Sequence, residues 1–258
     1  MGLLDIFKGR VEASSNQLSY NEQAVVRRLQ EVSMFGLSTE ELTPEQHKLK
    51  MESVLTIAEQ YNSQNNYATA RLFYALGNAY GAYTAWYIRG DDRKPYMSKA
   101  VINYEEAFRR KDSLPISTND HTLDSISQID IAGTLGRYLV QNTPIRDLSR
   151  AEDVLLFVRN NSVVYRPSLC SLIDLYYFKG MYEKSADIAH ELVEIQKISP
   201  DWKDSPAPYP ANAEAKAYRA LRNAAKKEND IPSAKKWSKK LLETGCPTNN
   251  DIKVRDKL

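Results

Sequence analysis

The sequence predicts an all-helical protein built from antiparallel helix hairpins. Only 10 of its 258 residues are glycine, and the 11 prolines fall mostly between stretches with helical periodicity. Within those stretches apolar residues recur at intervals of three and four, which places them on one face of a helix, whereas strand-like alternation is largely missing. Because the connectors 180–181 and 229–230 are so short, the helices that flank each of them are expected to be antiparallel neighbours.

The helices can be assigned in order along the chain. The first, near residues 20–35, has an apolar face formed by Val25, Val26, Leu29 and Val32. Thr43 followed by Pro44 is typical of a helix start, because threonine caps the first amides and proline fits the first turn. Further helices are expected near 45–63, 67–89, 95–111, 121–141, 147–160, 166–179, 182–197, 210–228 and 231–244. The helix at 67–89 carries a stripe predicted to pack on a neighbouring helix, formed by Phe73, Leu76, Tyr80, Tyr83 and Tyr87.

Composition and charge limit the classes of protein. Apolar residues make up 42% and charged residues 26% of the chain, close to the average for a soluble globular protein. The 35 basic and 33 acidic residues leave a formal net charge of +2, so nucleic-acid binding would need a local patch. The two cysteines, Cys170 and Cys246, favour a reducing compartment. The short apolar run at the start and the lack of a long apolar stretch predict a cytoplasmic protein with no membrane span.

The pattern of one segment, residues 172–192, predicts a helix hairpin. A glycine, Gly180, ends the first helix, and small residues let the second helix approach the first closely. The packing positions are Leu172 and Tyr176 on the first helix and Tyr182, Ser185, Ala189 and Leu192 on the second. A second segment, Leu76-Gly77-Asn78-Ala79-Tyr80, is followed by a helix with small residues at Ala100 and Ala107.

These segments resemble the tetratricopeptide repeat (TPR), a helix hairpin of about 34 residues whose first helix carries an L-G-x-x-Y pattern. Ala151 and Ser185 lie 185 − 151 = 34 residues apart. The steps from Ala100 to Ala151 and from Ser185 to Ala234 are longer, 151 − 100 = 51 and 234 − 185 = 49, so two units carry insertions of about fifteen residues. A related array of helix pairs is the main alternative, and the helix at 67–89 could belong to either of two pairs.

The resemblance covers roughly residues 45–244 and implies a right-handed superhelix, or α-solenoid, of about ten helices. It divides the chain into an N-terminal segment with one helix (1–44), the array (45–244) and a C-terminal tail (245–258). Such arrays usually bind a protein or peptide on the concave surface formed by the first helix of each pair. The candidate contact residues there are Arg71, Tyr74, Asn78, Arg137, Asp174, Tyr177, Arg219 and Asn223. Arginine can bind a carboxylate with two hydrogen bonds, and tyrosine offers a rigid contact area.

Two other segments are candidate surfaces. The proline-rich stretch 198–210 contains Trp202 and Tyr209, and it either contacts a partner or folds back over the array. The last hairpin, 214–243, has nine basic and four acidic residues, a net charge of 9 − 4 = +5. This basic hairpin could bind nucleic acid or another polyanion, or it could be the solvated face of a terminal repeat.

The residues with catalytic potential form no recognisable motif. His47, His121 and His190 stand apart from any metal-binding pattern, so neither a metal site nor a cofactor is expected. Gly133 and Gly136 lack the Gly-Lys-Ser/Thr ending of a phosphate loop, and a close helix crossing explains them better. The leading hypothesis is therefore a non-enzymatic scaffold or adaptor that binds a partner on its concave face. The alternatives are polyanion binding through 214–243, a peptide-sensing regulator, and an enzyme with an unrecognised active site.

Overall fold

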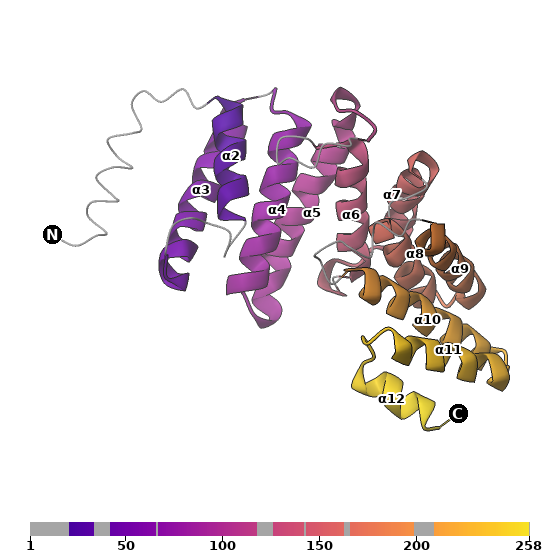
Figure 1. Ribbon diagram of the computed structural model, residues 1–258. Helices are drawn as coiled ribbons and strands as arrows, with labels where there is room; N and C mark the ends of the chain where they lie inside the picture. The colour runs from indigo at the N-terminus through magenta and orange to yellow at the C-terminus, as the bar shows by residue number, and fades with distance from the viewer. Residues whose placement is uncertain are drawn as a thin grey trace. The chain divides into compact units, whose positions relative to one another are not determined.

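The computed structural model describes residues 21–33, 42–65, 67–117, 126–141, 143–162, 166–198 and 209–257. Every regular element in these ranges is a helix (Figure 1), which confirms the predicted all-α class. The chain forms two compact units, Met1–Arg110 and Lys111–Leu258. The division between them falls inside the segment 45–244. Among the described helices, none combines the length and the apolar character needed to cross a membrane.

The described part of unit 1 contains α2 (Glu22–Val32), α3 (Pro44–Gln64), α4 (Ala70–Tyr87) and α5 (Arg93–Arg109), with a short 3-10 helix η1 (Gly90–Asp92) before α5. The start predicted at Thr43 and Pro44 is confirmed, because the Thr43 hydroxyl accepts a hydrogen bond from the Gln46 amide and the Gln46 side chain accepts one from the Thr43 amide. The four apolar residues predicted for the inner face of α2 are all buried. Helix α4 packs against α5, α2 and α3.

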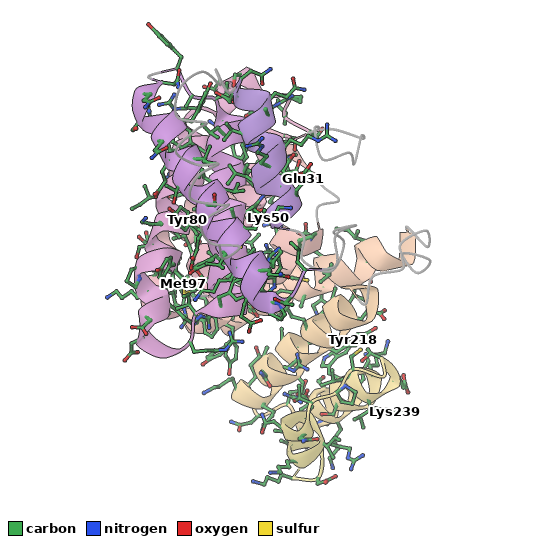
Figure 2. The ribbon with its side chains drawn as sticks, turned by 90° about the vertical axis from the view of Figure 1, so that its left-hand side faces the viewer. Glu31, Lys50, Tyr80, Met97, Tyr218 and Lys239 are labelled. Atoms are coloured by element: carbon green, nitrogen blue, oxygen red, sulfur yellow. The ribbon has the colours of Figure 1, made fainter. Side chains whose placement is uncertain are left out.

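The predicted stripe on α4 is core packing. Phe73, Leu76, Tyr80 and Tyr83 are buried, whereas Tyr87 at the end of the stripe is half-buried. The Tyr80 hydroxyl donates to Glu59 of α3, and the Lys99 amine of α5 donates to Glu59 over 2.9 Å and to the Tyr80 oxygen over 3.1 Å. Burial, and then the hydrogen bond to Glu59, raise the pKa of Tyr80 to about 12. Tyr80, labelled in Figure 2, thus ties α4 to both α3 and α5.

The described part of unit 2 contains α6 (Gln128–Gln141), α7 (Leu148–Asn161), α8 (Arg166–Phe178), α9 (Tyr182–Ile198), α10 (Tyr209–Lys227), α11 (Ile231–Glu243) and α12 (Asn249–Arg255), with 3-10 helices η2 (Lys111–Ser113) and η3 (Thr143–Ile145). The predicted hairpins are present, since α6 packs with α7, α8 with α9 and α10 with α11. The first helix of each later hairpin also packs on the hairpin before it: α8 contacts α6 and α7, and α10 contacts α8 and α9. Unit 2 is therefore built from hairpins added one after another.

Two expectations need correction. The helix predicted at 121–141 begins at Gln128, because the Ser127 hydroxyl accepts a hydrogen bond from the Asp130 amide while the Asp130 carboxylate accepts one from the Ser127 amide, which fixes a helix start. The segment 245–258, predicted to be a tail, contains the helix α12. Its start is fixed in the same way by Thr248 and Asp251. Both local signals are visible in the sequence once a capping box is sought.

The turns of the last two hairpins have the same geometry. Gly180 has a φ of +74° and Asn229 a φ of +58°, the left-handed conformation that ends a helix. In the first turn the Met181 amide donates to the Tyr176 carbonyl over 2.8 Å. In the second the Asp230 amide donates to the Ala225 carbonyl over 2.9 Å. The step of 229 − 180 = 49 residues equals the step between Ser185 and Ala234 predicted from the sequence.

Two glycines allow close helix crossings. A Cβ atom at Gly77 of α4 would lie 2.5 Å from the Tyr104 ring of α5, and one at Gly136 of α6 would lie 2.5 Å from Cγ of Leu155 in α7. Real Cβ atoms do not approach a neighbour so closely, so glycine is required at both places. This confirms that Gly136 serves a helix crossing.

Candidate functional site: a cationic groove in unit 2

Four of the eight contact residues predicted from the sequence line one groove in unit 2. The groove has a volume of about 640 Å³. Helix α8 contributes Asp174 and Tyr177, and helix α10 contributes Arg219 and Asn223. The side chains that complete the lining are Ile173, Phe178, Tyr182, Lys216, Ala220, Arg222, Lys226, Lys227, Asn250 and Val254. Since α8 and α10 are the first helices of neighbouring hairpins and pack together, residues spaced by three or four on each helix meet along the groove.

One part of the groove is aromatic. The Tyr177 ring lies 6.0 Å from the ring of Phe178 and 5.6 Å from that of Tyr182, both in edge-to-face geometry. Tyr177 is 41% and Phe178 44% exposed, although aromatic side chains of this size are usually largely buried. The Lys227 amine lies 5.2 Å above the Tyr182 ring. The groove thus offers rigid apolar surface next to positive charge.

The rest of the lining is mainly cationic. Five lining residues are basic and one, Asp174, is acidic, which gives 5 − 1 = +4. The Lys216 amine donates to the Asp174 carboxylate over 2.6 Å. In contrast, Lys226 and Lys227 form no ion pair within the described residues. These two adjacent lysines are the cations of the groove that a bound anion can reach without displacing an acidic partner.

Asp251 of α12 pairs with two further cations of the groove, Arg219 and Arg222. The Arg219 Nη2 donates to its Oδ2 over 2.7 Å, and the Arg222 Nη1 donates to its Oδ1 over 2.9 Å. The Thr248 hydroxyl donates to Oδ2 over 2.7 Å. Burial alone would raise the pKa of Asp251, but the hydrogen bonds from Arg219, Thr248 and Arg222 outweigh it and hold that pKa well below its usual range. Helix α12 is fastened to α10 by this carboxylate, and its Asn250 and Val254 form one wall of the groove.

Asn223 is oriented by its neighbour. Its side-chain oxygen accepts hydrogen bonds from Arg222 Nε over 3.2 Å and from Arg222 Nη2 over 3.0 Å. The oxygen is therefore occupied, and the amide nitrogen is the group that can donate to a ligand carbonyl or carboxylate. Because Arg222 is only 2% exposed and is held by Asp251, the orientation of Asn223 is determined by buried groups.

The other predicted contact residues lie apart from this groove. Arg71, Tyr74 and Asn78 are on α4 in unit 1, where the Tyr74 ring lies 5.9 Å from the Tyr104 ring and Asn78 accepts a hydrogen bond from the Tyr104 hydroxyl over 2.9 Å. Arg137 is exposed on α6 and does not line the groove. Trp202 lies outside the described residues. Tyr209 is the first residue of α10, and its side chain also lies outside the described part.

The basic hairpin 214–243 divides into two sets. Five of its cations, all on α10, line the groove: Lys216, Arg219, Arg222, Lys226 and Lys227. The other four are on α11, where the Lys236 and Lys240 amines lie 4.8 and 5.8 Å from the Trp237 ring. Lys235 and Lys239 are exposed, and Lys239 is labelled in Figure 2. The α10 set is the one that belongs to the candidate site.

Trp237 joins three helices. Its ring stacks on that of Tyr218 of α10 at 5.9 Å with an interplanar angle of 16°, and it lies 5.7 Å from the ring of His190 of α9. The indole therefore belongs to the packing of α9, α10 and α11, not to the groove.

Sequence reasoning missed the contribution of α12 and of the aromatic residues Phe178 and Tyr182. The pattern Thr248-x-x-Asp251 was the available signal for α12, because threonine followed three residues later by an acid is typical of a helix start. Within the described residues, no cluster of three or more His, Cys, Asp or Glu side chains could hold a metal ion. No protein-family model matches the chain, and a comparison with curated proteins finds no significant match.

Proposed function

We propose that the chain is a non-enzymatic scaffold or adaptor that binds a segment of a partner protein in the groove of unit 2. The observation that carries the proposal is that Asp174, Tyr177, Arg219 and Asn223, chosen from the sequence as contact residues, line one groove. The groove combines exposed aromatic rings, an oriented amide donor and cations. This mixture suits a peptide, which offers carbonyl groups, carboxylates and apolar side chains together.

A TPR-like array is the architecture that we propose for the chain. Three features support it: hairpins that pack on one another in order, glycine at the helix crossings of Gly77 and Gly136, and the same turn geometry at Gly180 and Asn229. Such an array is a right-handed superhelix, and the first helices of successive hairpins form its concave surface. Helices α8 and α10 are the first helices of their hairpins, so the groove lies where this architecture expects a ligand.

The proposal can be tested by photo-crosslinking in the native cell. A photoreactive phenylalanine derivative in place of Tyr177 would report what occupies the groove, and the same substitution at Tyr67, which is 93% exposed on unit 1, is the control. We expect a protein adduct from position 177 that is absent from position 67. The adduct should disappear when Asn223→Ala is added and persist when Asn160→Ala, an exposed asparagine of α7, is added instead. Equal adducts from both positions would contradict the proposal.

Polyanion binding is the second candidate function. The observation that favours it is the exposure of Lys235 and Lys239 on α11, together with Lys226 and Lys227 on α10, which have no ion-pair partner among the described residues. Binding of this kind weakens steeply with salt. Charge reversal at Lys235, Lys236, Lys239 and Lys240 should abolish it, whereas a peptide bound in the groove should be retained by that variant. The role of a peptide-sensing regulator rests on the family resemblance alone.

A further inference from the structure

The groove has more basic side chains than acidic partners for them. Three of its cations have an acidic partner, since Lys216 pairs with Asp174 while Arg219 and Arg222 share Asp251. Lys226 and Lys227 follow on the same helix without an acidic partner among the described residues. Both lysines are exposed, so an anion that enters the groove can reach them, and their two like charges attract it together.

Within the protein, α10 already binds a carboxylate, that of Asp251. The Asp251 carboxylate accepts hydrogen bonds from Nε and Nη2 of Arg219. It accepts another from Nη1 of Arg222. The two arginines and Lys226 are spaced by three and four residues, so they follow one face of the helix. A carboxylate from a partner that entered next to Asp251 would therefore meet Lys226 and Lys227 as the next cations on α10.

The exposed aromatic rings of the groove favour a ligand that also carries an apolar group. Tyr177 and Phe178 expose large parts of their rings at the groove, and Tyr182 lies against Tyr177. Covering this surface with an apolar side chain releases water from it, whereas a purely charged ligand would leave it hydrated. Asn223 adds a neutral donor for a backbone carbonyl of the same ligand.

From these observations we infer that the groove of unit 2 binds an acidic protein segment in which an apolar or aromatic side chain lies next to one or two carboxylates. The apolar side chain packs on Tyr177 and Phe178, and the carboxylates bind Lys226 and Lys227. This inference rests on the proposed function, because it specifies the occupant of the same groove.

A nucleic acid fits the groove less well. Its phosphates recur along the strand, so binding needs a track of cations that are free to replace the counterions. Here three cations already pair with Asp174 and Asp251, and among the described residues only Lys226 and Lys227 of the lining lack an acidic partner. An acidic peptide needs only one or two carboxylates for these two lysines, and its apolar side chain can cover the aromatic surface, which a chain of phosphates would not do.

The inference is tested by selecting short random peptides displayed on phage against the full chain. The selected peptides are then labelled, and their affinities are measured by fluorescence anisotropy. We expect enrichment of sequences with Asp or Glu next to an apolar residue. The Lys226→Glu, Lys227→Glu variant should bind them at least about tenfold more weakly, because a charge-assisted hydrogen bond is worth about that much. Replacing the acids of the peptide by their amides should have a similar effect.

The matched control is the Lys235→Glu, Lys239→Glu variant, which makes the same charge change on α11, outside the groove lining. It should keep the affinity of the unmodified chain, as long as circular dichroism shows that both variants are equally helical. A further variant, Tyr177→Ala, reports on the groove without changing charge, and it should also weaken binding.

The outcomes separate this inference from the proposed function. If the selected peptides carry no excess of acids but are lost by Tyr177→Ala, the acidic occupant is refuted while groove binding stands. If the peptides are retained by both groove variants, the two fail together. If no acidic peptide is selected and a single-stranded oligonucleotide binds and is lost by the Lys226→Glu, Lys227→Glu variant, the occupant is a nucleic acid and the inference is overturned.

Discussion

Asp251 of α12 and Arg222 of α10 form an ion pair of 2.9 Å in which the side chains are only 1% and 3% exposed. Asp251 is also the buried residue of α12, whereas Ile252 beside it is 37% exposed. Helix α12 is therefore held on α10 by a carboxylate and its hydrogen bonds more than by apolar packing. The groove depends on this pair, since α12 supplies one of its walls.

The first prediction concerns the removal of this carboxylate. Asp251→Ala leaves the buried Arg222 guanidinium without its anion, and breaking a buried pair in this way costs about 3–5 kcal/mol of unfolding free energy. The control is Asp256→Ala, which removes an ion pair with Arg255 whose side chains are about half exposed, and it should cost less than about 1 kcal/mol. Urea denaturation followed by circular dichroism measures both. Equal losses would show that α12 contributes little to the fold.

The second prediction is a pH dependence with a definite sign. The pKa of Asp251 is lower in the folded protein than its ordinary value, so its contribution to stability is complete above that value and is lost as the pH falls through the lower folded pKa. The Asp251→Asn variant carries no titrating group at this position. We therefore expect the stability difference between the two proteins to be largest near neutral pH and to shrink below about pH 4. A difference that stays constant over this range would contradict the assignment.

The third prediction concerns the crossing of α6 and α7. Gly136→Ala places a methyl group against Leu155 and should destabilise unit 2 by about 1–3 kcal/mol, even though alanine is the better helix former. The test is a double-mutant cycle with Leu155→Ala, measured by chemical denaturation. In the Leu155→Ala background there is room for the methyl group, so Gly136→Ala should no longer destabilise. Additive effects would mean that the two residues do not compete for the same space.

The fourth prediction uses the two turns with equal geometry. Gly180→Ala puts a Cβ into a left-handed conformation and should cost about 1–2 kcal/mol. Asn229→Gly makes the opposite change at the corresponding position and should raise the stability by less than about 1 kcal/mol. Thermal unfolding of both variants checks the signs. If both variants shift the stability in the same direction, the two turns are not equivalent.

The sequence was most informative where packing is periodic. Asp174 and Arg219, which line the groove, were predicted as contact residues because the repeat resemblance assigns one face of each first helix to ligand binding. On α4 the same reasoning selected Tyr74 and Asn78, which contact Tyr104 of α5. The reason is local: Gly77 lets the Tyr104 ring approach α4, so that its hydroxyl reaches Asn78. The periodicity of a sequence shows which residues share one face of a helix. It does not show which of them a long side chain from a neighbouring helix will contact.

Helix α12 could not be found from periodicity for a different reason. It has seven residues, and its buried contact is a carboxylate, so it has no apolar stripe. Its place depends on Arg219 and Arg222, which lie 32 and 29 residues before Asp251 in the chain. A charge that is satisfied by distant partners leaves no pattern in neighbouring residues, whereas the capping signal at Thr248 is local and readable.

Because Trp237 stacks on Tyr218, tryptophan fluorescence can report on the packing of the α10–α11 hairpin. The indole touches side chains from α9 and α10 while it belongs to α11, so its emission depends on how these three helices are docked. Tyrosine so close to tryptophan transfers its excitation efficiently, and loss of that transfer would report separation of α10 from α11. Separation of these helices during unfolding can thus be followed without any label, provided that Trp86 and Trp202 are first replaced by phenylalanine.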